Sequence, residues 1–86
     1  EYGIVNRAMP LANLDSLVSE WATKLGEGAP IAMRLGLANL NKGYTGDLSA
    51  ALEREQEAQM ECLRSKDMMR GVQAFFQKVT PEFVGD

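Results

Sequence analysis

The feature that most constrains the fold is the spacing of apolar residues, which follows a helical period over most of the chain. The first such stripe comprises Leu14, Leu17, Val18, Trp21, Ala22 and Leu25. Intervals of three and four residues place these side chains on one face of an amphipathic helix that starts at about Leu11. Asn13 or Asp15 is the expected N-cap, and Gly26 or Gly28 is expected to end the helix.

A second helix is predicted from Pro30, which is tolerated in a first turn, to about Asn41. Its apolar residues occupy most of its circumference: Ile31, Ala32, Met33, Leu35, Leu37, Ala38 and Leu40. A helix that is apolar nearly all round has to be covered on several sides. A chain of 86 residues has few neighbours for this, so part of the cover is expected from the rest of a larger protein or from another subunit.

A third helix is predicted after the turn-rich segment 41–46, with Asp47 as its N-cap and Arg64 near its end. Glu55 and Gln59 interrupt its apolar face one turn apart. Polar side chains at this spacing either contact a buried interface or form a solvated notch, and both alternatives stay open.

A fourth helix is predicted from Lys66 to about Val79, capped by Ser65, with Asp67 in the first turn, where a carboxylate suits the helix dipole. Its inner face carries Met68, Met69, Val72, Phe75, Phe76 and Val79. Burying these side chains would contribute on the order of 10 kcal/mol of transfer free energy before entropy is counted. We expect helix-on-helix core packing to account for most of this stripe, with Phe76 nearest a ligand or a neighbouring subunit.

Length and charge restrict the class of protein. Eighty-six residues suit one small domain, and a start at Glu1 without a methionine or signal peptide suggests a piece of something larger. The net charge of −3 and the scattered basic residues argue against nucleic-acid binding. No apolar run approaches the ~20 residues that span a bilayer. We therefore expect neither nucleic acid nor membrane as a partner.

Residue types with catalytic or metal-binding chemistry are few. The chain has no histidine and one cysteine, which leaves no plausible zinc or haem ligand set and no internal disulfide, so we expect a reducing, cytoplasmic setting and no metal. Cys62 lies mid-helix without a neighbouring base and is expected to be an inert thiol. The helical carboxylates Glu53, Glu55, Glu57 and Glu61 point in different directions and indicate a solvated acidic face. An independent small enzyme is therefore disfavoured.

The last third reads Ala51-Leu52-x-x-Glu55-x-x-x-Gln59-x-x-x-Leu63-x-Ser65-x-Asp67-x-x-x-Gly71-x-x-Ala74-Phe75-x-x-Lys78-x-x-Pro81-x-Phe83. This pattern resembles the C-terminal end of the crotonase (enoyl-CoA hydratase/isomerase) family, whose members act on acyl-CoA thioesters. Gly3-Ile4-Val5-Asn6 followed by Pro10 is similar to the family's last short strand. The resemblance implies an all-α unit of about four helices, with residues 1–10 as a short strand or extended arm left from a spiral core and 11–86 as the C-terminal helical domain.

The same resemblance implies what this domain does. In crotonase-like enzymes the oxyanion hole and the acid/base glutamates lie upstream, so no catalytic residue is expected here and the chain alone should be inactive. The C-terminal helices pack a trimer or dimer of trimers, close over the acyl pocket as a lid, and reach the CoA, which enters only as part of the substrate; no separate cofactor is implied. Lys78 and Phe76 are the candidates for CoA binding, although Lys78 is equally compatible with a solvated lysine near a helix end. The candidates for core or oligomer contacts are Glu55, Gln59, Met68, Met69, Val72 and Phe75.

Four positions depart from the family's pattern. Arg70 stands where a glutamate is common, Val79 where a second basic residue is common, Leu37 where many members carry a lysine, and Gln59 where some hydratases are aromatic. These differences leave open which acyl-CoA is used and whether the reaction is hydration, isomerisation or hydrolysis.

Two functions from different classes compete. In one, the chain is the C-terminal helical portion of an enoyl-CoA hydratase/isomerase-type enzyme, with the remainder or N-terminal half of that enzyme, acyl-CoA and a homo-oligomer as partners. In the other, it is a stand-alone helical module for self-association or protein interaction. They differ in what covers the apolar second helix and the stripe from Met68 to Val79.

Overall fold

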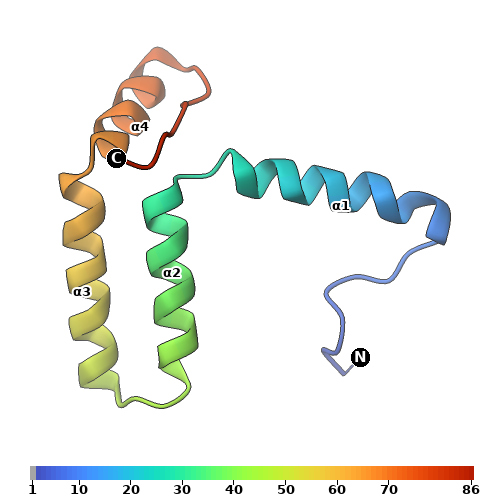
Figure 1. Cartoon of the computed structure of the whole chain (residues 1–86), viewed down its shortest axis with the longest axis horizontal. Coiled ribbons are helices and arrows are strands. Elements are labelled where there is room, and N and C mark those ends of the chain that lie inside the picture. Colours follow the sequence, from blue (N-terminus) through green and yellow to red (C-terminus); the bar gives the residue numbers. More distant parts are fainter. Residues whose placement is uncertain (1) are drawn as a thin grey trace.

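The computed structural model describes residues 2–86, which hold four α-helices and no strand (Figure 1). The helices are α1 (Leu11–Gly26), α2 (Pro30–Gly43), α3 (Leu48–Arg64) and α4 (Lys66–Gln77). Helices α2 and α3 form an antiparallel hairpin, α4 follows at the end of α3, and α1 projects sideways from the start of α2. The prediction of a small all-α unit is confirmed.

The molecule is open. Its Cα radius of gyration is 16.5 Å and its principal extents are 43 × 40 × 18 Å, whereas a compact chain of this length has a radius of gyration of about 12 Å. Within residues 2–86 the extensive helix contacts are those of α2 with α3 and of α3 with α4. Helix α1 therefore presents its apolar stripe without a packed partner helix.

The starts of α3 and α4 agree with the predicted caps. The Asp47 carboxylate accepts a 2.8 Å hydrogen bond from the Ala50 N–H at the start of α3. The Ser65 hydroxyl accepts a 3.1 Å bond from the Met68 N–H and donates a 2.7 Å bond to the Cys62 carbonyl. Each cap satisfies a donor that the first turn of a helix leaves without an intrahelical partner. Both capping predictions are confirmed.

The start of α1 differs from the prediction. Pro10 is its N-cap residue, without a side-chain cap, and its carbonyl accepts a 3.0 Å bond from the Asn13 N–H. Asn13 and Asp15 therefore lie inside the helix, and the prediction that one of them caps it is wrong. The fixed φ of proline, −56° here, favours helix initiation at this point without a side-chain cap.

Helix α2 begins at Pro30 as predicted and continues to Gly43, beyond Asn41. Helix α4 ends at Gln77, short of the predicted Val79. Lys78 adopts the left-handed conformation (φ 56°, ψ 40°), and the Lys78 and Val79 N–H groups donate to the carbonyls of Phe75 and Ala74 at 3.2 and 3.0 Å. This is a Schellman ending, which turns the chain back along the helix.

Residues 2–10 form neither helix nor strand and are exposed apart from a half-buried Met9. The segment bends at residues 3–6, where Gly3 has a φ of +69°. Its origin in the core of a larger protein stays a prediction.

The apolar helix faces are largely uncovered. Only Ala74 and Asp67 are buried among residues 2–86. Phe75 and Phe76 are 78% and 77% exposed, and Val72 alone of the predicted α4 stripe is half-buried. The expectation that helix-on-helix packing covers most of this stripe is therefore wrong for this chain, because α3 is the one helix that α4 contacts extensively within residues 2–86.

Candidate functional site

An apolar groove of about 400 Å³ lies between the start of α2, the end of α3 and α4. We call it the apolar groove. Its lining residues are Ala29, Ile31, Ala32, Cys62, Ser65, Asp67, Met68, Gly71, Val72, Phe75, Phe76 and Phe83. Most of these side chains are hydrocarbon or aromatic, so the groove suits an apolar ligand or an apolar segment of protein.

Two adjacent phenylalanines dominate the open side of the groove. The rings of Phe75 and Phe76 meet edge to face, with centroids 5.7 Å apart and planes at 77°. This geometry is favourable for aromatic pairs. Both rings nevertheless remain mostly exposed to solvent on the same helix.

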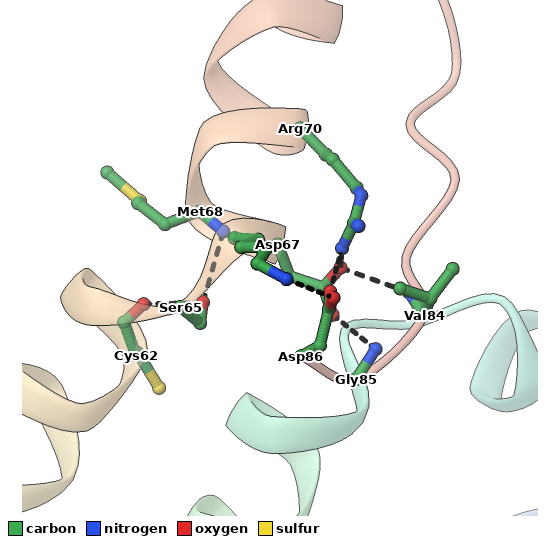
Figure 2. Close-up of polar contacts among 9 residues, drawn as sticks. Cys62, Ser65, Asp67, Met68, Arg70, Val84, Gly85 and Asp86 are labelled. Atoms are coloured by element: carbon green, nitrogen blue, oxygen red, sulfur yellow. Dashed lines mark hydrogen bonds and ion pairs between the residues drawn. The ribbon is translucent and has the colours of Figure 1, made fainter.

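Residues 78–86, which we call the C-terminal tail, contribute Phe83 to the groove lining. Figure 2 shows how Asp67 holds its end. The Asp67 carboxylate accepts hydrogen bonds from the N–H groups of Val84 at 3.0 Å and Gly85 at 2.7 Å, and the Asp67 N–H donates to the Asp86 carbonyl at 3.1 Å. With the side chain of Asp67 only 3% exposed, these bonds satisfy a buried charge that would otherwise be costly.

Three charged side chains surround this contact. Arg70 donates from one guanidinium nitrogen to the Asp67 carboxylate at 2.6 Å and also pairs with the Asp86 carboxylate. Lys66 lies 3.1 Å from the other Asp86 oxygen. Arg70, a departure from the family's pattern, thus has two carboxylate partners here.

These contacts shift the pKa values of the carboxyl groups. The hydrogen bond from Arg70, aided by that from Lys66, lowers the pKa of Asp86 to about 2. For Asp67, burial acts to raise the pKa, but the hydrogen bonds from Val84, Arg70 and Gly85 outweigh it, and the net pKa is lowered. Both groups are therefore ionised at neutral pH.

Phe83 joins the tail to the groove. A Cβ at Gly71 would lie 3.4 Å from the Phe83 ring, so the ring sits directly over the one residue of α4 that has no side chain. Because Gly71 lies one turn after Asp67, the polar and aromatic attachments of the tail share a face of α4.

The predicted site residues fall into two groups. Phe76, Phe75, Met68 and Val72 line the apolar groove. Met69 is exposed on α4 outside it.

The remaining candidates lie away from the groove lining. Glu55 and Gln59 are exposed on α3. Lys78 is exposed at the left-handed end of α4. The assignments of Lys78 and Phe76 to CoA, and of the others to an interface, stay predictions.

Sequence reasoning missed two parts of the site. It did not place Ile31 or Phe83 beside α4, and it assigned Asp67 only to the helix dipole. The spacing of Asp67 and Gly71 was a usable signal, since a carboxylate and a glycine one turn apart leave room for a returning chain.

Within residues 2–86, no group of three or more carboxylate or cysteine side chains is arranged to hold a metal ion. None of the helices described is long and apolar enough to cross a membrane.

The fold and the groove together define a helical unit with an apolar groove and largely exposed apolar helix faces. Comparison with known proteins identifies its class: the family model "Enoyl-CoA hydratase/isomerase" matches residues 1–86. The chain belongs to the enoyl-CoA hydratase/isomerase family, which confirms the resemblance to the C-terminal helical part of the crotonase fold.

Individual relatives agree. The "Short-chain-enoyl-CoA hydratase" of Clostridium acetobutylicum is 33% identical over 76 residues, which cover 88% of this chain and 29% of the relative. The mouse "Enoyl-CoA hydratase domain-containing protein 2, mitochondrial" is 30% identical over 89 residues, 99% of this chain and 30% of the relative. Because some relatives are named as mitochondrial, the cytoplasmic location stays a prediction.

Solved structures show the same correspondence in three dimensions. The crystal structure of an enoyl-CoA hydratase from Bacillus anthracis superposes with a TM-score of 0.93 at 34% identity, covering 99% of this chain and 33% of that one. A probable enoyl-CoA hydratase/isomerase from Mycobacterium abscessus superposes at 0.89 with 30% identity. The chain thus spans about a third of the length of these relatives.

Proposed function

We propose that this chain is the C-terminal helical portion of an enoyl-CoA hydratase/isomerase-type enzyme acting on acyl-CoA thioesters, where it supplies part of the acyl-CoA pocket and oligomer contacts. The apolar groove, with Phe75 and Phe76 on its open side, is the observation that carries the proposal. Family membership over residues 1–86 supports it.

The groove matches the chemistry of an acyl chain. An acyl-CoA thioester joins an apolar chain to a charged nucleotide, so its pocket needs a dry apolar part and a rim that tolerates phosphate. The one charged group in the groove lining, Asp67, is neutralised locally by Arg70. An apolar chain therefore meets no unpaired charge there.

The chemistry of the reaction is assigned to the remainder of the enzyme. Among the described residues the candidate site holds no paired acid and base and no nucleophile with a neighbouring base. The chain's part is to cover, position and exclude water from the substrate, which strengthens the electrostatic interactions of reacting groups supplied by other residues.

The uncovered faces support a role in assembly. Helix α1 exposes Val18 and Leu25, and α4 exposes Met69 and its two phenylalanines. A remaining two thirds of an enzyme, or further subunits, would cover these faces in a homo-oligomer.

A chimaera tests the proposal. The third of the Bacillus anthracis hydratase that corresponds to this chain is replaced by residues 1–86, and hydration of a short trans-2-enoyl-CoA is followed by loss of the conjugated thioester absorbance. We expect the parental oligomeric mass and measurable hydration, both absent when the third is simply deleted.

Two outcomes oppose it. A folded chimaera of parental mass that binds no CoA thioester would contradict a role in the acyl-CoA pocket. If instead the 86-residue chain forms a defined oligomer on its own and does not complement the truncated hydratase, the alternative of a stand-alone self-association module is favoured.

A further inference from the structure

The two walls of the apolar groove are joined indirectly. Helix α2 packs on α3 and α3 on α4, while α2 and α4 are not among the extensively contacting pairs of residues 2–86. The C-terminal tail leaves the end of α4 and returns to the first turn of the same helix (Figure 1). A Cβ at Gly85 would lie 3.4 Å from the Cβ of Pro30, the first residue of α2.

Hydrogen bonds hold the tail at its two ends. At the near end, the Val79 N–H donates to the Ala74 carbonyl at 3.0 Å. At the far end, Asp67 receives the N–H groups of Val84 and Gly85 and donates its own N–H to Asp86 (Figure 2). The tail is therefore a strap attached at both ends, and one buried carboxylate, that of Asp67, holds its far end.

The strap carries one residue into the groove. Phe83 lies between the two fastenings, against Gly71, and lines the same cavity as Ile31 and Phe76. The position of its ring depends on where the strap is fastened. The fastening requires φ of +86° at Gly85, a conformation that residues with a Cβ rarely adopt.

We propose that Asp67 is a positioning residue of the apolar groove: by fastening residues 84–86 beside Pro30, it sets the separation of α2 from α4 and holds Phe83 as a wall. It touches the strap and not the reacting atoms of a substrate. The identity of the ligand as an acyl-CoA rests on the proposed function. The attachment of residues 84–86 by Asp67 does not depend on it.

The first experiment uses the full 86-residue chain and the variant Asp67→Asn. Asparagine keeps the shape but turns an amide N–H₂ toward the N–H of either Val84 or Gly85, so one donor faces another. Hydrogen exchange at Val84 and Gly85 should then be faster. Cys62, the single thiol, lines the groove, and its alkylation by a bulky maleimide should accelerate several-fold.

Asp47→Asn is the matched control. Asp47 also accepts a backbone N–H, that of Ala50, but at the distant start of α3, and asparagine is an equally good N-cap. It should leave exchange at Gly85 and alkylation of Cys62 unchanged. Wild-type exchange and alkylation rates in Asp67→Asn would overturn the proposal.

Gly85→Ala disturbs the same hydrogen bonds by a change in the tail. It leaves α4 untouched and imposes strain at the left-handed φ, so it should reproduce both effects while helicity by circular dichroism is kept. If both variants lose their helicity, the strap supports the fold as a whole, and a specific positioning role is wrong.

The chimaera gives the second readout. In Asp67→Asn the KM for a long-chain enoyl-CoA should rise about tenfold more than that for a short one, the effect of leaving roughly two methylene groups uncovered. The change should fall on KM more than on kcat, because the reacting groups lie elsewhere. Equal effects on both substrates would oppose a role in the groove. If the wild-type chimaera binds no thioester, the proposed function fails, while exchange and alkylation still decide the role of Asp67.

Discussion

The Asp67 carboxylate, in the first turn of α4, accepts a 2.7 Å hydrogen bond from the Gly85 N–H, 18 residues further along the chain. This contact holds the C-terminal tail against the first turn of α4, and the tail contributes Phe83 to the lining of the apolar groove. It also makes the groove sensitive to charges that lie outside its apolar lining, at Arg70 and Asp86.

Acidification should release the tail. The pKa values of Asp67 and Asp86 are lowered from 3.8 in the folded chain, that of Asp86 to about 2. Groups with a depressed folded pKa contribute stability that is fully present above the unfolded value and is lost as pH falls toward the folded value. The Gly85 amide resonance should therefore stay constant from neutral pH to about 4 and move as the pH falls further. A transition near neutral pH would contradict this account.

Ser65→Ala should lower the free energy of unfolding by about 1 kcal/mol, because the hydroxyl caps α4 through Met68 and also donates to Cys62. Ser16→Ala is the matched control: that hydroxyl only donates to the Asn13 carbonyl on an exposed helix and should matter little. Urea unfolding monitored by circular dichroism, in the chimaera, compares the two. Equal losses would mean that the cap at Ser65 contributes nothing special.

Two substitutions at Lys78 separate the effect of its backbone conformation from the effect of its charge. Lys78→Gly relieves the left-handed strain but adds chain entropy to the unfolded state, so stability should rise by about 0.5–1 kcal/mol. Lys78→Gln keeps the strain and removes the charge, leaving stability unchanged. Both should weaken CoA-thioester binding by the chimaera if Lys78 contacts phosphate. Unchanged affinity in both would assign Lys78 to the helix ending alone.

The exposed phenylalanines should make the isolated chain associate. Light scattering should give a mass above the 9.5 kDa of one chain, with binding of an apolar dye at micromolar concentration. Phe75→Ser combined with Phe76→Ser should reduce both signals, whereas Tyr44→Ser, on an exposed turn away from the groove, should not. A sharp monomer peak without dye binding would refute the expectation.

The ion pair that links α2 to α3 should contribute little to the free energy of unfolding. Arg34 and Glu61 approach to 2.5 Å, but both side chains are at least half exposed. Water and salt screen such pairs, so Glu61→Gln should change the free energy of unfolding by less than about 0.5 kcal/mol. A larger loss in the chimaera would show that this pair becomes buried on assembly.

The groove was only partly predictable. Phe75, Phe76, Met68 and Val72 were found because helical periodicity puts them on one face. Periodicity did not predict that this face would remain largely open, because it shows which residues need to be buried and not which residues bury them.

The sequence by itself determined where the helices lie and how α3 and α4 begin, because the caps at Asp47 and Ser65 and the proline at the start of α2 act within one helical turn. Family membership was likewise readable from the spacing in the last third. Only the tertiary structure decided that Lys78 reverses the chain and that Asp67 meets Gly85. Lys78 adopts the left-handed conformation without the glycine that usually signals such a turn, and the hydrogen bonds of Asp67 join it to residues 17 and 18 positions away, too far for a local sequence pattern to record.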